Sequence, residues 1–278
     1  MSTNPQGTLA GLHDYHMHSY LCGHGVGVPA EYAAHAANLG LDEIGFSEHV
    51  PMYWLPGRDP DPELAMTADE LPLYFELVEA ARRAVPDMPI HLGLEADYIP
   101  GHEATLAGIL AAHPWDYVYG SVHFLGTWGM DDARYVEEFE RRDIDAVYEE
   151  YFGLVEAAAR SGMFDIMAHL DLVKKFGHRA TGDLRGLYAQ VARTMAASEV
   201  CVEVNSAGLR KPVGEIYPHI DLLRALYVAG VPVTLGSDAH QPDHVGADFA
   251  TSLRLLREVG YQRVVRFANR ERSYVALP

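Results

Sequence analysis

The sequence predicts an α/β protein, a distorted (β/α)7 TIM-like barrel that forms a single domain over residues 1–278. Short apolar runs rich in β-branched and aromatic residues alternate with longer amphipathic segments seven times, the order of a parallel barrel rather than of a sandwich or a bundle. The glycine-rich stretch 23–27 lacks the phosphate-binding fingerprint of a doubly wound open sheet, which is the main structural alternative. Histidines and carboxylates follow the apolar runs, where barrel enzymes carry their chemistry.

The apolar runs are four to eight residues long, as expected for buried strands. In chain order the predicted strands are 11–18, 43–47, 90–95, 117–122, 166–169, 200–205 and 233–236. The predicted helices are 30–39, 70–84, 103–112, 144–161, 183–197, 220–229 and 249–259, and glycines follow the first, sixth and seventh of them as stop signals.

Two segments outside this alternation receive separate interpretations. The stretch 51–69 carries four prolines and is expected to form a loop over one end of the barrel. The segment 263–277 fits either a last short strand or a helix.

The composition excludes several classes of protein. The 39 Asp+Glu residues outnumber the 21 Lys+Arg residues, so the net charge of −18 has the wrong sign for a general nucleic-acid-binding surface. Two cysteines, Cys22 and Cys201, are too few for a disulfide framework or an all-thiolate zinc module. Residues 1–11 show no signal-peptide pattern and no run has the length of a membrane span, so we expect a cytoplasmic protein without a membrane partner.

Side chains that can bind metal ions stand at or after the ends of six predicted strands. His16 and His18 are two residues apart in an extended run, so they share one face. His24 follows in a glycine-rich loop that is free to bring it back to the same place. Because the carboxyl ends of barrel strands meet, we expect nine donors to converge: His16, His18, His24, His49, Glu95, His123, His169, Asp238 and His240.

Nine donors exceed the roughly four ligands of one tetrahedral zinc and the roughly six to eight of a two-metal site. Three divalent metal ions are the natural count. Imidazole and carboxylate donors without thiolate suit zinc, manganese or iron and leave the choice among them open.

Other polar residues receive structural interpretations. Cys22 is expected to be a small buried thiol rather than a further ligand, and Asp14 and Glu48, which flank ligands, are expected to orient imidazoles. Six histidines away from the motifs are expected to be ordinary surface or core side chains: His35, His91, His102, His113, His178 and His219.

The order of the motifs resembles the polymerase and histidinol phosphatase (PHP) superfamily of metallo-phosphoesterases, and the resemblance extends over residues 12–246. It implies a distorted (β/α)7 barrel with a trinuclear centre. The implied ligand sets are His16, His18, Glu95 and Asp238 for one metal, His24, His49 and His240 for a second, and Glu95 again as a bridge with His123 and His169 for the third.

Three longer stretches resemble the histidinol-phosphate phosphatase branch of that superfamily: GSVHFLGTWGMD at 120–131, HLDLVKKFG at 169–177 and VNSAGLRKPVGEIYP at 204–218. This resemblance implies hydrolysis of L-histidinol phosphate to L-histidinol and phosphate, a step of histidine biosynthesis, by attack of a metal-bridging hydroxide. Arg210 would be the catalytic clamp on the phosphoryl oxygens, although without the resemblance it is better interpreted as a surface arginine. Lys174, Lys175 and Lys211 are weaker candidates for that role.

Alternative functions remain open at this point. The same metal site could act on another small phosphorylated substrate, such as a nucleotide, a sugar phosphate, phosphotyrosine or a DNA 3′ end. Which substrate binds would depend on the loops at 51–69, 124–131 and 210–216. The chain could also be a non-catalytic metal-binding module. An amidohydrolase-type barrel is disfavoured, because histidines 123 and 169 stand where a carboxylated lysine would be expected.

Overall fold

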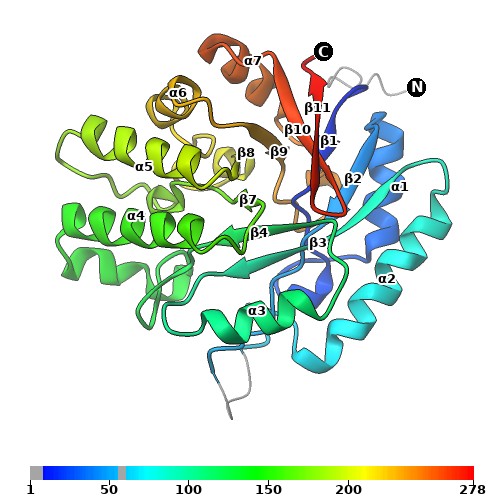
Figure 1. Cartoon of the computed structure of the whole chain (residues 1–278). Helices are drawn as coiled ribbons and strands as arrows, with labels where there is room; N and C mark the ends of the chain where they lie inside the picture. Colours follow the sequence, from blue (N-terminus) through cyan, green and yellow to red (C-terminus); the bar gives the residue numbers. More distant parts are fainter. Residues whose placement is uncertain (1–8, 56–60) are drawn as a thin grey trace.

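The computed structural model describes residues 9–55 and 61–278. Its core is a sheet of seven parallel strands in the order β1-β2-β3-β4-β7-β8-β9, curled into a nearly closed barrel with the helices outside (Figure 1). The strands are β1 His13–Asp14, β2 Glu43–Phe46, β3 Ile90–Asp97, β4 Tyr117–Ser121, β7 Ile166–Met167, β8 Cys201–Asn205 and β9 Val233–Gly236. The predicted barrel is therefore confirmed.

All seven predicted helices are present: α1 Pro29–Leu39, α2 Leu71–Ala84, α3 Glu103–Ala111, α4 Ile144–Arg160, α5 Arg185–Ala197, α6 Ile220–Val228 and α7 Phe249–Val259. Short 3-10 helices lie between them: η1 Tyr20–Cys22, η2 Ala68–Glu70, η3 Ala133–Arg141, η4 Leu172–Lys174, η5 Ala207–Arg210 and η6 Pro242–His244. The glycines after α1 and α7 end these helices in the left-handed conformation, with φ of 77° at Gly40 and 118° at Gly260.

The barrel closes between β1 and β9 mainly at its carboxyl end. There Met17 bridges Ala239 in parallel, and the backbone N–H of His18 donates to the carbonyl of Ala239 over 2.9 Å. At the other end the two strands are joined by side chains, with His13 Nε2 2.8 Å from Thr234 Oγ1. β1 is consequently shorter than the predicted run 11–18, because regular pairing with β2 stops at Asp14.

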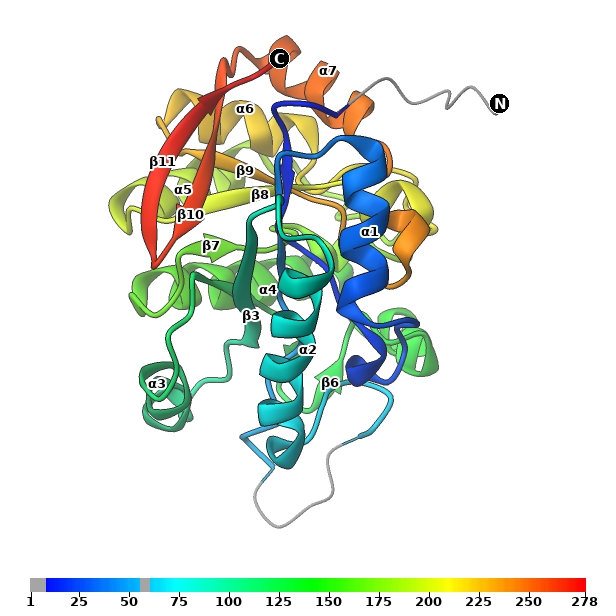
Figure 2. The ribbon, with the colours of Figure 1, turned by 90° about the vertical axis from the view of Figure 1, so that its right-hand side faces the viewer.

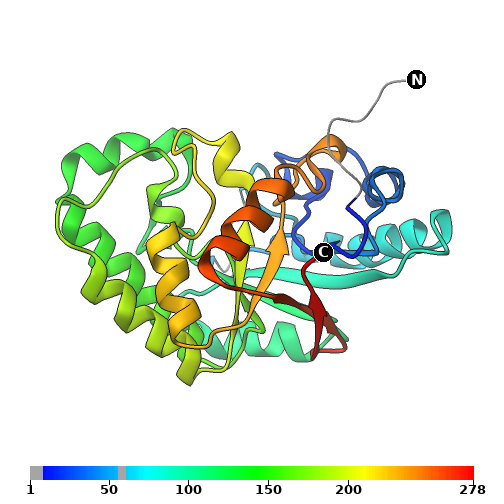
Figure 3. The ribbon, with the colours of Figure 1, turned by 90° about the horizontal axis from the view of Figure 1, so that it is seen from above.

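The segment after α7 forms an antiparallel hairpin of β10 Arg263–Ala268 and β11 Glu271–Ala276, so of the two predicted alternatives the strand is correct. Its two-residue turn has positive φ at both Asn269 and Arg270, as a type I′ hairpin turn requires. β10 places Val265 and Phe267 among the buried barrel residues. In Figure 2 this hairpin stands away from β6, near the other end of the barrel, and Figure 3 shows the C-terminus beside the residues that precede β1.

Two segments lie near the carboxyl end of the strands, the short hairpin of β5 Phe124–Leu125 and β6 Trp128–Gly129 and the start of the predicted 51–69 loop. The Tyr53 hydroxyl donates to the carbonyl of Asp97 over 2.7 Å, and the Trp54 ring meets Phe124 edge-on.

Residues 56–60 of the loop and residues 1–8 of the chain lie outside the described residues. Over the described parts, every helix is too short or too polar to cross a lipid bilayer. A single domain over 1–278 stays a prediction.

Candidate metal centre

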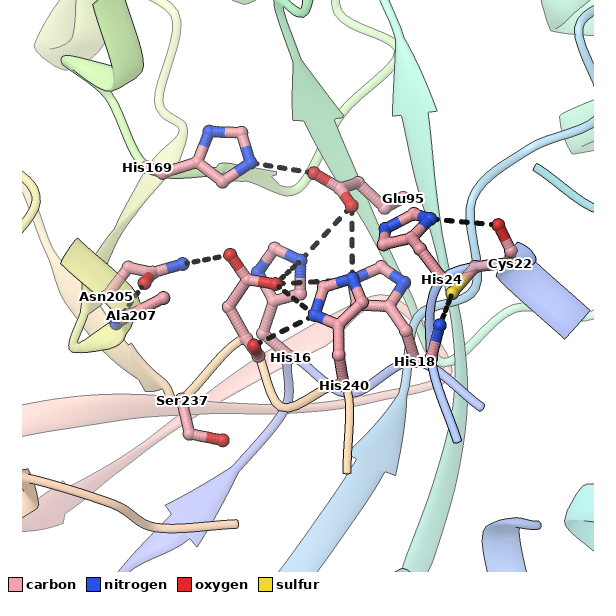
Figure 4. A network of polar contacts seen from close by, with 12 residues as sticks. His16, His18, Cys22, His24, Glu95, His169, Asn205, Ala207, Ser237 and His240 are labelled. Carbon is pink, nitrogen blue, oxygen red and sulfur yellow. Dashed lines mark hydrogen bonds and ion pairs between the residues drawn. The ribbon is translucent and has the colours of Figure 1, made fainter. Parts of the chain in front are cut away.

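The nine predicted donors gather at the carboxyl end of the barrel. Parallel strands bring their carboxyl ends together, so side chains far apart in sequence become neighbours. Figure 4 shows His16, His18 and His169 pointing toward Glu95. The donors come from these elements: His16 and His18 after β1, His24 after η1, His49 after β2, Glu95 in β3, His123 after β4, His169 after β7, and Asp238 and His240 after β9.

The carboxylate of Glu95 is the middle of the cluster and is almost completely buried. Five imidazoles surround its two oxygens. Oε2 lies 3.2 Å from His16 Nε2, 3.3 Å from His18 Nε2 and 3.0 Å from His49 Nδ1, and Oε1 lies 2.9 Å from His169 Nε2 and 3.5 Å from His123 Nε2. Glu95 is thus placed to share its oxygens between two neighbouring positions.

Asp238 is a second carboxylate beside the same Nε2 atoms of His16 and His18. Its Oδ1 is 3.6 Å from His18 Nε2, 3.9 Å from His16 Nε2 and 3.4 Å from His240 Nδ1. Asp238 and His169 have positive φ, of 51° and 22°, which is uncommon for residues other than glycine. Backbone strain of this kind concentrates at functional sites.

His24 and His240 form one edge of the cluster. His24 Nδ1 lies 3.0 Å from the carbonyl of Cys22 and 2.8 Å from that of Glu63, so the Nε2 nitrogen is left for a ligand. The rings of His24 and His240 stack at 4.6 Å, and the ring of His49 lies 5.5 Å from His24.

Two independent observations indicate that the cluster is suited to bind metal ions. First, several of its buried atoms make no hydrogen bond with any described residue, namely Glu95 Oε2 and the Nε2 atoms of His16, His18 and His240. Buried polar atoms without partners are costly unless something binds them. Second, ligand atoms approach within 4.8 Å of one another in these sets: His16, His18 and Glu95; His16, His169 and Asp238; His49, Glu95 and His123; His18, His49 and His240; Cys22, His24 and His240.

The charges of the cluster also suit cations. Burial would lower the pKa of His16, yet Glu203, Glu95 and Asp238 raise it well above its ordinary value, so positive charge is favoured at this position. Burial lowers the pKa of His240 to about 3 and that of His24 to about 4. These two imidazoles are therefore neutral at neutral pH, which is the form that binds a metal.

Two connected cavities lie over the centre. The smaller, of about 170 Å³, reaches the donors themselves. The larger, of about 630 Å³, has an aromatic wall of Trp54, Phe124 and Phe176. Six residues line both cavities: His24, His49 and His123 from the donor set, and Asp131, Lys175 and Lys211. Lys175 Nζ lies 3.0 Å from Asp131 Oδ2.

The model of the PHP domain family matches residues 14–207, most of the chain. The chain belongs to the PHP domain family. This PHP domain is 44% identical over 264 residues to a probable histidinol-phosphatase of Deinococcus radiodurans, across 95% of this chain and 99% of that relative. It is 30% identical over 257 residues to the histidinol-phosphatase of Bacillus subtilis, across 84% of this chain and 95% of that relative.

A solved structure shares the fold of this PHP domain over nearly its whole length. It is the histidinol phosphate phosphatase of Lactococcus lactis, complexed with zinc, L-histidinol and phosphate. The TM-score is 0.81 at 24% identity, and the match covers 95% of this chain and 99% of that one.

Arg210 of this PHP domain lies at the end of η5 beside the centre. Its Nη2 donates to the carbonyl of Ser237 over 2.5 Å, and its Nη1 lies 3.9 Å from Asp248 Oδ2. Lys175 and Lys211 are the cationic residues that line both cavities among the described residues, and Arg210 lines neither cavity. The clamp role of Arg210 stays a prediction.

Two carboxylates beside the donors escaped the sequence prediction. Glu203, inside β8, accepts from His16 Nδ1 over 2.7 Å, and Asp97 accepts from His123 Nδ1 over 2.8 Å. A carboxylate can only accept here, so it places the proton of each imidazole on Nδ1 and leaves Nε2 free to bind a metal. Asp97 could have been found from its spacing, since it lies two residues after Glu95 in the same strand.

The structural interpretations of other residues have mixed outcomes. Asp14 accepts from the backbone N–H groups of His16, Ser237 and Gly246, so it holds backbone, contrary to the expectation that it orients an imidazole. Glu48 Oε2 lies 4.0 Å from His18 Nδ1, beyond hydrogen-bond distance. Cys22 is buried as expected, although its sulfur belongs to one of the close donor sets.

Proposed function

We propose that this PHP domain is a metal-dependent phosphomonoesterase that hydrolyses L-histidinol phosphate to L-histidinol and phosphate. The observation that carries the proposal is a cluster of nine donors at the base of a cavity, all of them buried or half-buried except the exposed His24. The match to histidinol-phosphatases over nearly the full length, at 44% identity in one case, supports this substrate over other phosphate esters. The cytoplasm is the proposed location.

We infer that three divalent ions occupy the cluster, with zinc, manganese and iron as candidates. The proposed ligands are His16, His18, Glu95 and Asp238 for one, His24, His49 and His240 for another, and Glu95, His123 and His169 for the third. Such ions, when bound, make a coordinated water acidic enough to ionise near neutral pH and attract phosphate oxygens.

The chain itself supplies orientation and charge. Glu203 and Asp97 hold His16 and His123 with Nε2 toward the centre, through the 2.7 and 2.8 Å contacts to their Nδ1 atoms. Lys211 adds positive charge where the linings of the two cavities overlap, in a chain whose net charge is −18, whereas the charge of Lys175 is paired with Asp131. We also propose that Arg210 clamps the phosphoryl oxygens, which requires its guanidinium to exchange the Ser237 carbonyl for substrate.

The larger cavity suits the organic part of the proposed substrate. An imidazole is flat and apolar on its faces, and the aromatic wall of Trp54, Phe124 and Phe176 offers it stacking and edge contacts. A second candidate function keeps the metal site and changes this part of the substrate to a nucleoside, a sugar or a tyrosyl group. The same cavity would then accept a different ring.

Two measurements on protein purified without chelator test the proposal. Elemental analysis should find close to three divalent ions per chain. Phosphate release should be fastest from histidinol phosphate in a panel that also contains a nucleotide, a sugar phosphate and phosphotyrosine. Faster release from another member would establish the second candidate, and full metal content without any hydrolysis would identify a non-catalytic metal-binding module.

A further inference from the structure

The distribution of lysine in this chain is uneven. The sequence holds eighteen arginines and only three lysines, Lys174, Lys175 and Lys211. The three lysines lie on two segments, the one that follows β7 and the one that follows η5, and Lys175 and Lys211 line the small cavity at the donor cluster. These segments are tied together, because the backbone N–H of Val213 donates to the carbonyl of Lys175 over 3.1 Å. Lysine is thus confined to these two segments, whereas arginine occurs throughout the chain, including Arg210 next to Lys211.

Two of the three lysines are neutralised by neighbours. Lys174 is buried, lines neither cavity, and has its Nζ 2.9 Å from Asp171 Oδ2 and 3.3 Å from Glu215 Oε2. Lys175 Nζ lies 3.0 Å from Asp131 Oδ2 and donates to the carbonyl of the same residue over 2.7 Å. Neither ammonium has a free charge to offer a ligand without first losing a carboxylate.

Lys211 differs from both. Its ammonium makes no hydrogen bond or ion pair with any residue in the described parts of the chain, yet its side chain lines the small cavity together with His49, Glu95 and Asp238. It also lines the larger cavity, so it stands where the two join. The loop that carries it is fixed, because Gly208 packs so closely on the Glu215 carbonyl that a Cβ there would lie 1.9 Å from that oxygen.

We propose that Lys211 is a catalytic residue that binds the non-bridging oxygens of the substrate phosphate at the junction of the two cavities. This inference rests on the proposed phosphoesterase function. A free ammonium beside the donor cluster meets a phosphate dianion as a point charge and adds a charge-assisted hydrogen bond. The position differs from that of Arg210, whose guanidinium is already bound to the Ser237 carbonyl.

The test compares Lys211→Ala and Lys211→Arg with the wild type, all loaded with metal. Titration calorimetry with inorganic phosphate is the first readout. We expect Lys211→Ala to weaken phosphate binding by about ten- to a hundredfold, the usual worth of one charged hydrogen bond, and Lys211→Arg to restore most of it. Metal content should be unchanged in both variants. Arg185→Ala is the matched control, because it removes one positive charge from an exposed pair with Asp183, and neither residue lines the two cavities.

The second readout is kcat/KM for an alkyl ester, histidinol phosphate, and an aryl ester, p-nitrophenyl phosphate. A contact to the phosphoryl oxygens predicts that Lys211→Ala loses a similar factor on both. A loss confined to the alkyl ester, with phosphate binding unchanged, would overturn the proposal and assign Lys211 to the leaving group. Wild-type binding and turnover in Lys211→Ala would overturn it as well. Should the wild type leave histidinol phosphate intact, the proposed function fails, and the phosphate titration still decides the role of Lys211.

Discussion

Replacement of Glu203 by glutamine probes how the chain holds its candidate metal ligands. Glu203 is fully buried in β8 and accepts three hydrogen bonds. Oε1 accepts from His16 Nδ1, and Oε2 accepts from the backbone N–H of His169 over 2.9 Å and from Asn205 Nδ2 over 3.0 Å. All three partners donate, so both carboxylate oxygens are required as acceptors.

A glutamine has one acceptor oxygen and one NH₂ group, so it satisfies only part of this arrangement. If its oxygen faces His16, the NH₂ group faces two donors, and the contacts to His169 and Asn205 are lost. If the NH₂ group faces His16, it donates to Nδ1 and moves the ring proton to Nε2. Nε2 is the nitrogen that lies 3.2 Å from Glu95, and a protonated nitrogen cannot bind a metal.

Loss of one hydrogen bond to a charged group costs about 1.5–3 kcal/mol, which corresponds to roughly ten- to a hundredfold in metal affinity. We therefore expect Glu203→Gln to weaken metal binding by that factor in a competition titration against a chelator, with kcat falling in step with occupancy. Glu156→Gln is the matched control. Glu156 is also buried and bonded to three side chains, Thr194, Gln190 and Arg160, but it lies on α4.

Two results would refute this role of Glu203. If Glu203→Gln binds metal as tightly as the wild type, Glu203 does not set the proton position of His16. If Glu156→Gln weakens metal binding equally, the effect of Glu203→Gln reflects general destabilisation and not the hydrogen bonds to the site.

Three further outcomes are expected. Glu95→Ala should lose metal content and activity together, because five imidazoles surround its carboxylate. The control His35→Ala, on α1, should change little in the same elemental and phosphate-release assays. Equal, mild effects of the two variants would refute the assignment of ligands to strand ends. Arg210→Ala should keep its metals while kcat/KM falls by ~10²-fold or more, about 2.7 kcal/mol. Arg210→Lys should recover part of the lost kcat/KM. Unchanged turnover of Arg210→Ala at full metal occupancy would make Arg210 a structural contact to Ser237. Burial would lower the pKa of His91, but Asp116 and Glu43 raise it from 6.5 to about 9, so its stabilisation is complete below pH 6.5 and is lost as the pH rises through 9. Urea unfolding between these pH values should therefore show a smaller decline in the free energy of unfolding for His91→Gln than for the wild type, and parallel declines would count against this ion pair.

The donors of the candidate centre were predictable because their spacing carries the geometry. His16 and His18 share a face by strand periodicity, and the carboxyl ends of parallel strands converge in any barrel. Residues such as Asp238 and His169 could therefore be placed together without coordinates. Which donors share an ion does not follow from spacing, because it depends on distances of a few tenths of an ångström.

The supporting residues were less accessible from sequence. Glu203 stands inside the apolar run of β8, where one carboxylate among valines gives no indication of its partner on β1. Regular pairing of β1 with β2 stops at Asp14, and the bridge that closes the barrel, Met17 with Ala239, joins residues more than 200 positions apart, so neither feature could be predicted from local sequence. Arg210 and Lys211 are neighbours in sequence, and only side-chain direction separates a contact with the Ser237 carbonyl from a position at the cavity junction.

The hairpin of β10 and β11 completes the barrel core with residues that come after all candidate ligands in the sequence. All nine candidate ligands have been translated once His240 is made, whereas Val265 and Phe267, which fill the amino end of the barrel beside Tyr15, come later. A chain that ends before β10 would therefore contain every candidate ligand but would leave Tyr15 and the neighbouring core residues uncovered. Exposed core surface promotes aggregation of incomplete chains. Removal of the hairpin is therefore expected to make the protein prone to aggregation, although all nine candidate ligands remain in the chain.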